Sequence, residues 1–354
     1  MNLLSRYIGK TILLNTLLVV IVLVALSAVF GFIRELDDVG KGEYSLAIAA
    51  IYIVLRVPGS AYELFPSAVL LGSLLGMGAL ASQSELTVMR SAGISVAQIV
   101  KSVLMIGLLL MVAVVLIGEF VMPGSEIQAQ GMRSAALAKR VSISEKTGYW
   151  ARSDNRYINI KTVLPDISLI DIRVYEFDRA QLSSVVAAGK AVQQKDGKWL
   201  LSGVVRNDYS SGNVVISERE TEIWPKLVNT ELLQGLSVPV ESMSASNLVR
   251  QVAYLRSNQL DSRQIELALW TKIANPVATL VMLLLSLPFV FGSQRSGGTG
   301  QKIFVGILLG IGFFLINRLF THLGLAYGLN PATSTLIPLV LFGCIALVGV
   351  KRIT

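Results

Sequence analysis

Few residues in this chain could carry out catalysis. The 354 residues include one histidine, His322, and one cysteine, Cys344. A serine hydrolase needs a histidine that a carboxylate orients beside a serine, and no acidic residue lies close to His322 in the sequence. A single cysteine excludes an intrachain disulfide and a cysteine-rich zinc site. These observations argue against a hydrolytic enzyme and against a metal centre.

Three short motifs resemble nucleotide-binding sequences but lack the context that such sites need. GKT at Gly9–Thr11 lacks the earlier glycine of a P-loop, because position 4 is Leu4. GMGALA at Gly76–Ala81 lies inside an apolar run, where small residues favour close packing of helices. SGGTG at Ser296–Gly300 is typical of a flexible turn. The sequence therefore predicts no ATP hydrolysis and no bound cofactor in this chain.

The elements that must position the remaining polar residues are apolar helices. The chain is 53% hydrophobic and only 15% charged, whereas about 25% of residues in a soluble domain are charged. Apolar runs of this length indicate a membrane protein with six spans, arranged as three plus three. The expected spans are Thr11–Ile33, Ser60–Ala81, Ser102–Met122, Leu267–Phe291, Ile303–Phe320 and Thr335–Val350. The first is about 23 residues long, which favours a retained span over a signal peptide.

Lysine and arginine in the short loops predict the orientation of the spans. With the N-terminus inside, the inner segments hold Arg6, Lys10, Arg90, Lys101, Arg295, Lys302, Lys351 and Arg352. The outer short segments hold Arg34, Lys41, Arg56 and Arg318. Both termini are then expected in the cytoplasm and the large insert outside. The net charge is +8, but the basic residues lie beside the spans and form no continuous basic stripe. This distribution argues against nucleic acid as a partner.

The insert between spans three and four is predicted to be an all-β domain. We expect residues 1–123 to hold the first three spans, 124–265 the insert with a connecting helix, and 266–354 the last three spans. Short strands without helices between them suggest an antiparallel sandwich or jelly roll. The expected strands are Gly148–Ser153, Arg156–Val163, Ser168–Phe177, Leu182–Gln194, Lys198–Tyr209 and Asn213–Trp224. Asp196–Gly197 is a typical hairpin turn, and Ser244–Trp270 reads as helical.

A short amphipathic helix is expected in the cytoplasmic loop at about residues 83–97. Ser84 is placed to cap it, with Glu85 near its start and Arg90 near its end. Gly93 can end the helix, because glycine tolerates the left-handed conformation. The expected apolar side is Leu86, Val88 and Met89. The residues leave two interpretations equally open: a helix that contacts a cytoplasmic partner, or an interfacial helix without one.

Four segments resemble one family of membrane proteins. SELTVMRSAG at Ser84–Gly93 resembles the cytoplasmic coupling segment of the LptF/LptG permease family. The similarity extends to RYIGKTILLN at Arg6–Asn15, to VPGSAYELFPSAVLLGSLLGMG at Val57–Gly78 and to NPVATLVMLLLSLPFVFG at Asn275–Gly292. The resemblance covers the whole chain, including three spans on either side of an external β domain.

This resemblance implies a function and partners. Members of the family are permease subunits of an ABC-type transporter that extracts lipopolysaccharide from the inner membrane of Gram-negative bacteria. It implies an LptF-like second permease subunit, two LptB-like ATPases that bind ATP and Mg²⁺, and an LptC-like bridge protein. The external jelly roll would pass lipid along a periplasmic bridge. By match to the family, the residues expected to couple to the ATPase are Glu85, Leu86, Met89, Arg90 and Gly93.

A phosphorylated lipid with several acyl chains implies an apolar cavity with a basic rim at the outer surface. The expected rim is Arg34, Lys41, Arg133, Arg318 and His322, and the apolar residues beneath it are Phe30, Phe32, Phe65, Ile316 and Phe320. In the family, spans one and five line this cavity. Basic residues also commonly end spans by reaching for the interface regardless of substrate. Relatives place lysines around the end of span one, whereas this chain has Asp37 and Asp38 in that region. Arg34 or Lys41 would then take the role of those lysines, or a divalent cation would bridge the acids to phosphate.

Two other classes of function compete with lipid transport. One is a membrane scaffold that anchors the β domain and recruits partners. The other is a mechanical relay that transmits ATPase movement to the β domain without carrying lipid. Lipid crosslinking to spans one and five separates transport from both, and substitution of Glu85 or Arg90 separates the scaffold from the other two.

Overall fold

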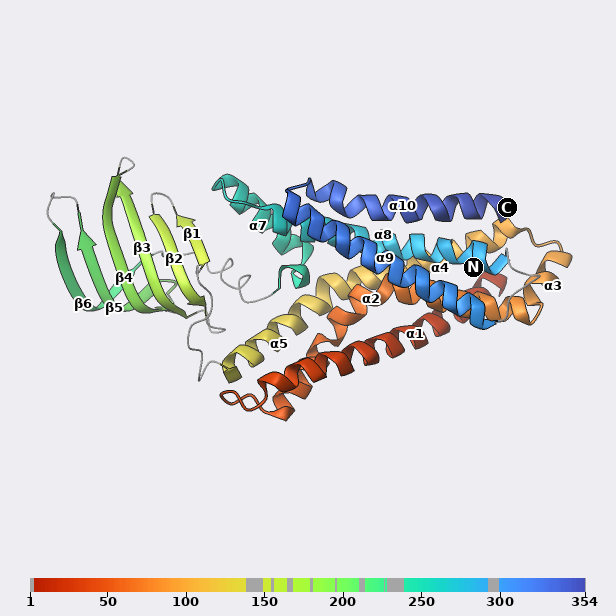
Figure 1. Ribbon diagram of the computed structural model, residues 1–354, viewed down its shortest axis with the longest axis horizontal. Coiled ribbons are helices and arrows are strands. Elements are labelled where there is room, and N and C mark those ends of the chain that lie inside the picture. The colour runs from red at the N-terminus through yellow and green to blue at the C-terminus, as the bar shows by residue number, and fades with distance from the viewer. Residues whose placement is uncertain are drawn as a thin grey trace. The chain divides into compact units, whose positions relative to one another are not determined.

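A computed structural model describes residues 3–137, 149–153, 156–163, 168–178, 181–194, 196–209, 214–225, 227, 239–291 and 299–353. Contacts divide the chain into two units (Figure 1). The helical unit comprises Met1–Arg34, Ile53–Ser125 and Glu241–Thr354. The mixed unit comprises Glu35–Tyr52 and Glu126–Val240. Arg295 and residues 296–298 of the SGGTG segment, for which we made predictions above, lie outside the described residues.

Six candidate membrane spans are present in the described part of the chain, as predicted. The helices that form them are α1 (Leu3–Glu35), α2 (Leu46–Ser82), α4 (Val96–Leu116) with α5 (Met122–Leu137), α8 (Arg263–Phe291), α9 (Thr299–Tyr327) and α10 (Pro331–Ile353). A π-helical turn, Ile117–Val121, joins α4 to α5. The shorter helices are α3 (Glu85–Ser91) and α7 (Ala245–Ser257).

The observed helices extend beyond the predicted spans. Helix α2 begins at Leu46 rather than Ser60, because Pro58 lies inside the helix and does not limit it. Proline is tolerated in membrane helices where neighbouring groups satisfy the freed backbone. Helix α4 begins at Val96, where Ser95 and Gln98 form a capping box. The predicted connecting helix is two helices, because the chain breaks between Ser257 and Arg263.

Helix α8 lies at the centre of the helical unit, where it contacts α4, α7, α9 and α10. Met282, Leu283 and Leu285 on α8 are buried in the helical core. Gly107 on α4 brings that helix close to α8, because a Cβ there would lie 2.6 Å from the Leu283 side chain. A small residue at such a crossing lets two membrane helices approach closely.

Two glycines on α2 hold α1 close in the same way. A Cβ on Gly72 would lie 2.4 Å from the Cα of Thr16, and a Cβ on Gly76 would lie 3.1 Å from the Thr11 carbonyl oxygen. These glycines are four residues apart, the spacing of a small-xxx-small packing motif. The interpretation of Gly76 as a packing residue is therefore confirmed.

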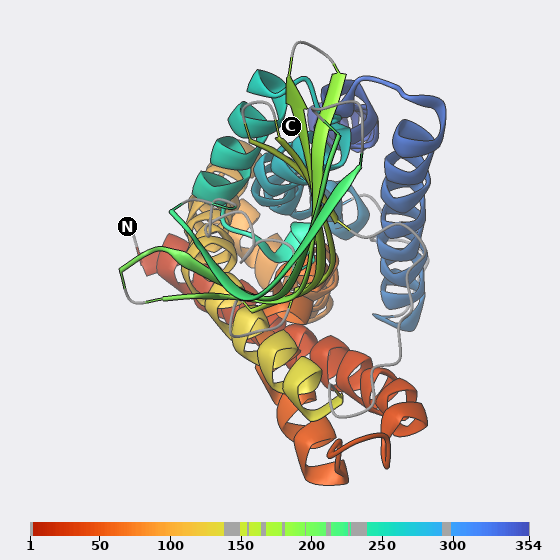
Figure 2. The same ribbon diagram turned by 90° about the vertical axis from the view of Figure 1, so that its left-hand side faces the viewer.

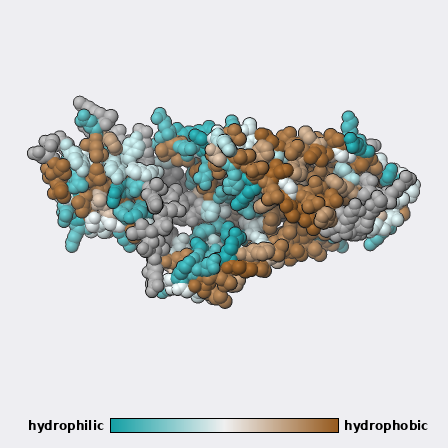
Figure 3. Space-filling model, viewed as in Figure 1, coloured by the Kyte–Doolittle hydropathy of each residue, from teal (hydrophilic) through white to brown (hydrophobic). Residues whose placement is uncertain are grey.

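Helices α1 and α9 are the least covered of the six spans. Only 17% of the residues in the apolar window of each are buried, compared with 67% in α2. Apolar side chains such as Leu18 and Ile21 on α1 and Leu308 and Leu315 on α9 are exposed. Figure 3 shows the broad apolar surface of the helices on one face. These two spans leave apolar faces for lipid or for another membrane chain to cover.

The mixed unit contains a six-stranded antiparallel sheet in the order β1-β2-β3-β4-β5-β6. The strands are β1 (Tyr149–Ser153), β2 (Arg156–Val163), β3 (Leu169–Asp178), β4 (Gln181–Gln193), β5 (Trp199–Asp208) and β6 (Val215–Trp224). Each boundary lies within two residues of its predicted position. Gly197 takes a φ of +84°, which confirms the hairpin turn between β4 and β5.

The described strands form one sheet, which differs from a two-sheet sandwich. The sheet pairs consecutive strands and bends strongly upon itself (Figure 2). Alternate residues such as Ile158, Ile172 and Val186 are buried on its inner side, together with Trp199. A strongly curved sheet can enclose its own apolar face, so strand alternation alone could not distinguish it from two stacked sheets.

Candidate functional site

The helix predicted at about residues 83–97 is shorter in the structure, where α3 covers Glu85–Ser91 and α4 begins at Val96. Ser84 adopts a φ of +61° and its side chain makes no capping hydrogen bond, so the prediction of a serine cap was wrong. The end of the helix is as expected: Gly93 has a φ of +88°, and its N–H donates to the Arg90 carbonyl at 3.1 Å. The Ile94 N–H donates to the Met89 carbonyl at 3.1 Å, which completes a Schellman-type ending.

The apolar residues of α3 point in different directions. Leu86 is fully buried in the core of the helical unit, and Met89 packs against that core. Val88 is 64% exposed, so the prediction that it shares their side was wrong. Because Leu86 is buried within its own chain, it packs α3 against the helical core and is not exposed to a partner. Arg90 is exposed, and the half-buried Glu85 lies next to the Tyr7 phenol of α1.

Hydrogen bonds join the first span to the third and cap the start of α4, which follows α3 in the chain. The Ser5 hydroxyl of α1 lies 2.7 Å from the Ser102 hydroxyl of α4. The Ser95 hydroxyl accepts from the Gln98 N–H at 3.3 Å, and the Gln98 side chain accepts from the Ser95 N–H at 3.1 Å. The first contact joins α1 to α4, and the other two cap the start of α4.

Two of the predicted basic residues meet in one charged cluster in the mixed unit. Arg133 on α5 donates from Nε to Glu35 at 2.9 Å and from Nη2 to Asp38 at 2.5 Å. Lys41 pairs with the other oxygen of Asp38 at 2.6 Å. The Arg133 guanidinium also lies 5.7 Å from the centre of the Tyr52 ring. We call Glu35, Asp38, Lys41 and Arg133 the span-end cluster. Its two cations and two carboxylates balance in charge.

A short loop positions the span-end cluster against α5. Gly42 has a φ of +61°, and a Cβ there would lie 2.5 Å from the Ala136 carbonyl oxygen, so glycine is required. The Glu43 N–H donates to that same carbonyl at 2.8 Å. The buried Tyr44 hydroxyl donates to Glu35 at 2.9 Å. Burial and this hydrogen bond raise the pKa of Tyr44 well above its ordinary value, so the phenol remains a donor.

The other predicted lipid contacts lie on three helices of the helical unit. Phe65 on α2 is a buried core residue, which makes a direct lipid contact unsuitable for it in this arrangement. Ile316 packs against the same core from α9. The remainder are exposed or half-buried on their helices: Phe30, Phe32 and Arg34 on α1, and Arg318, Phe320 and His322 on α9. Among the described residues no group of three His, Cys, Asp or Glu is arranged to hold a metal.

A second polar junction was missed by the sequence reasoning. Lys272 on α8 is only 9% exposed, and its Nζ donates to the Met243 carbonyl. Glu119 in the π-helical turn accepts from the N–H groups of Ala245 at 2.8 Å and Ser246 at 3.4 Å. Glu119 therefore caps the positive end of α7. A lysine and a glutamate inside apolar spans were the available signal, because such residues are rarely placed there without a role.

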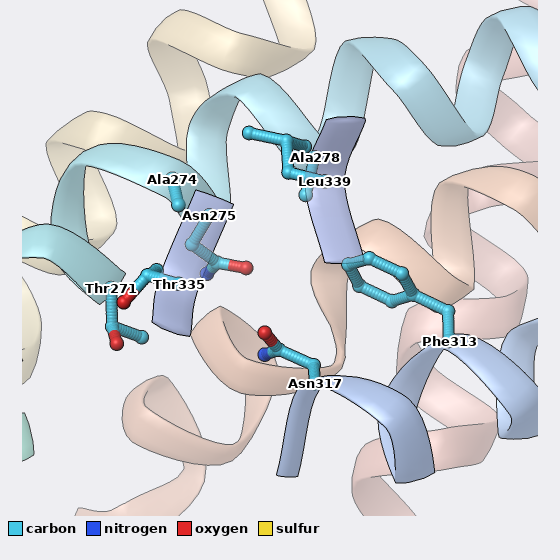
Figure 4. Close-up of a pocket in the computed structure, with 8 residues that line it drawn as sticks. All are labelled: Thr271, Ala274, Asn275, Ala278, Phe313, Asn317, Thr335 and Leu339. Atoms are coloured by element: carbon cyan, nitrogen blue, oxygen red, sulfur yellow. The ribbon is translucent and has the colours of Figure 1, made fainter. Parts of the chain in front are cut away.

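A small polar cavity lies between α8, α9 and α10 (Figure 4). Its volume is about 20 Å³, enough for one water molecule. Figure 4 shows Asn275 and Asn317 projecting into it from α8 and α9. Asn275 Nδ2 also donates to the Tyr62 carbonyl at 2.9 Å. The cavity is too small for an acyl chain, so it is not a lipid site.

Comparison with known proteins places these features in a family. Residues 6–352 match the model of the family described as "Lipopolysaccharide export system permease LptF/LptG". The chain is 35% identical to lipopolysaccharide export system permease protein LptG of Haemophilus influenzae, with 96% of each chain covered. It is 34% identical to the protein of that name in Escherichia coli K12, over 97% of this chain and 96% of the relative. This chain belongs to the LptF/LptG family of lipopolysaccharide export permeases.

Proposed function

We propose that this chain is a permease subunit that extracts lipopolysaccharide from the inner membrane of a Gram-negative bacterium for export. The full-length similarity to relatives named as lipopolysaccharide export permeases carries this proposal. The apolar faces of α1 and α9 support it, because a lipid needs spans that the rest of the chain leaves uncovered. The aromatic and basic residues at the ends of these two helices supply groups for acyl chains and phosphates.

The energy for extraction is proposed to come from a separate ATPase. Helix α3 would contact an LptB-like subunit through Glu85, Val88 and Arg90, while the buried Leu86 and the partly buried Met89 would hold the helix in place. Two such ATPases would bind ATP and Mg²⁺, and this chain would bind no cofactor of its own. Movement of α3 would reach α1 through the contact of Glu85 with Tyr7, and the Ser5 and Ser102 hydroxyls link α1 to α4.

The remaining parts of the proposal concern partners and location. An LptF-like subunit would cover part of the exposed apolar faces and leave the rest to lipid, and an LptC-like protein would continue the path beyond the membrane. Both termini are then cytoplasmic and the curved sheet periplasmic, following the distribution of Lys and Arg. The inner side of the sheet is apolar, but Ile158, Ile172 and Trp199 are buried there and offer acyl chains no exposed contact in this arrangement.

Site-specific photocrosslinking tests this proposal. A photoreactive amino acid is placed at Phe32, Arg34, Lys41, Ile316 or Phe320, in membranes that contain the ATPase and partner subunits. Cys344 on α10 provides a position outside the proposed path as a control. We expect lipopolysaccharide crosslinks at the first five positions that change when ATP is added. Crosslinks to protein partners alone at all five would reject lipid transport and favour a scaffold or a relay.

A further inference from the structure

The span-end cluster shows Arg133 already engaged by two carboxylates. Glu35 and Asp38 each place one oxygen on one edge of its guanidinium, at Nε and at Nη2. Two oxygens on one edge of an arginine are also what a bound phosphate provides, since carboxylate and phosphate recognise the same planar fork. The acids therefore occupy the edge of Arg133 that a phosphorylated ligand would use.

The charges of the span-end cluster are also compatible with a phosphate taking the place of the two carboxylates. Lys41 and Arg133 carry two positive charges, and Glu35 and Asp38 carry two negative ones. A phosphomonoester carries about −1.5 to −2 charges near pH 7. One phosphate could therefore replace both carboxylates as counter-ion to the two cations. With the carboxylates in place, the cluster offers a phosphate little net attraction.

The surroundings allow the cations to exchange partners. The Lys41 side chain is 61% exposed and that of Arg133 is 29% exposed, so both can be reached by a ligand. Glu35 is nearly buried, yet it does not depend on Arg133 alone, because the Tyr44 hydroxyl donates to the same oxygen at 2.9 Å. When Arg133 turns to a ligand, Glu35 keeps a hydrogen-bond partner, which lowers the cost of leaving a carboxylate behind.

We propose that Glu35 and Asp38 act as internal counter-anions, which hold Arg133 and Lys41 until the phosphate of a lipid displaces them. This inference rests on the proposed function, because it specifies how the same basic residues take up and release their ligand. The ligand class is a phosphomonoester on an acylated headgroup. By competing with phosphate, the carboxylates lower affinity and favour release of the lipid after it has moved.

The experiment measures binding of two lipids by the complex of this chain with its partner subunits in nanodiscs. The probes are lipid A with both phosphates and the same lipid A after enzymatic removal of its phosphates. The variant is Glu35→Gln with Asp38→Asn, which keeps side-chain shape and removes both charges. The matched control is Asp37→Asn on the same turn, because Asp37 is exposed and acidic but is not a member of the span-end cluster.

The double variant is expected to bind phosphorylated lipid A about three- to tenfold more tightly, because the competing ion pairs are lost. Its affinity for dephosphorylated lipid A should be unchanged, and Asp37→Asn should shift neither affinity by more than about twofold because an exposed charge is screened. Weaker or equal binding of phosphorylated lipid A by the variant would overturn the inference, as would equal tightening for both lipids. If the double variant does not assemble, Asp38→Asn alone is tested, and it should likewise tighten binding of phosphorylated lipid A without changing that of dephosphorylated lipid A.

The two proposals fail in distinguishable ways. If the unsubstituted complex binds neither form of lipid A, the proposed function is wrong. If it binds phosphorylated lipid A and the neutral variants bind no better, the proposed function stands and only the role of Glu35 and Asp38 is wrong.

Discussion

Adding a methyl group at the close contact between α1 and α2 should destabilise the packing of these two helices. In Gly72→Ala the new Cβ would lie 2.4 Å from the Cα of Thr16 and 2.6 Å from its backbone nitrogen. These distances are about 1 Å shorter than an ordinary van der Waals contact. Because the obstructing atoms belong to the backbone, a side-chain rotation cannot relieve the overlap. Helix α1 must therefore move away from α2.

The matched control for this change is Gly78→Ala. Gly78 lies on the same helix, and a Cβ there would meet nothing within 4 Å. Overpacking by one methyl group in a close contact costs about 1–3 kcal/mol. Replacing an open helical glycine by alanine is neutral or stabilises by about 0.5–1 kcal/mol. The two variants add the same atom, so their difference isolates the contact between α1 and α2.

Unfolding by titration with SDS, monitored by circular dichroism, measures this difference on the purified complex. We expect Gly72→Ala to unfold at a lower SDS fraction than the unsubstituted chain and Gly78→Ala at an equal or higher one. Since α1 is a proposed lipid-contacting span, Gly72→Ala should also lower lipid crosslinking at Phe32. Identical unfolding of the two variants would refute the close approach of α1 and α2 at Gly72.

Three further predictions concern polar groups. Glu85→Ala should lower lipopolysaccharide transport about tenfold or more, because a hydrogen bond to a charged group contributes about 1.5–3 kcal/mol. The control Thr87→Ala, at an exposed position on the same helix, should leave transport unchanged. Equal transport by both variants would contradict the coupling role of Glu85. Lys272→Met should lower the free energy of unfolding by about 1–3 kcal/mol, because the Met243 carbonyl loses its hydrogen-bond donor. Proteolysis near the start of α7 should also become faster. Unchanged proteolysis would argue against the role of Lys272 in holding Met243. Tyr44→Phe should destabilise the chain equally at pH 6 and pH 9. The pKa of Tyr44 is raised above its ordinary value of 10, so the stability that its hydroxyl contributes is fully present below pH 10 and is lost only at higher pH. If the stability difference between Tyr44→Phe and the unsubstituted chain disappeared between pH 6 and pH 9, the phenol would not be protonated as described.

The sequence predicted the regular elements well because their signals are local. Apolar runs long enough to cross a bilayer identified all six spans. Alternation and turn residues placed the strands, and Gly197 stands where Asp-Gly predicted a hairpin. Positive φ at Gly93 likewise follows from a single residue whose conformational freedom the sequence displays.

What the sequence could not predict depends on contacts between distant residues. The second span was predicted to begin at Ser60, but α2 begins at Leu46 and continues through Pro58 and Pro66, which membrane helices tolerate where neighbouring groups satisfy the freed backbone. Ser84 has the residue type of a cap, yet the tight turn before α3 gives it a left-handed backbone. The basic residues at span ends were identified by type alone, and the pairing of Arg133 with Glu35 across 98 positions became visible only in the structure.

Reconstituted transport shows directly whether this chain is needed to move lipopolysaccharide out of a membrane. Vesicles that contain lipopolysaccharide, this chain, its partner permease and the ATPase are supplied with ATP, and lipopolysaccharide that reaches a soluble acceptor is measured over time. We expect release that requires ATP and this chain, and that falls sharply with Glu85→Ala. Release at the same rate from vesicles without this chain, or ATP hydrolysis that never moves lipopolysaccharide to the acceptor, would contradict the account.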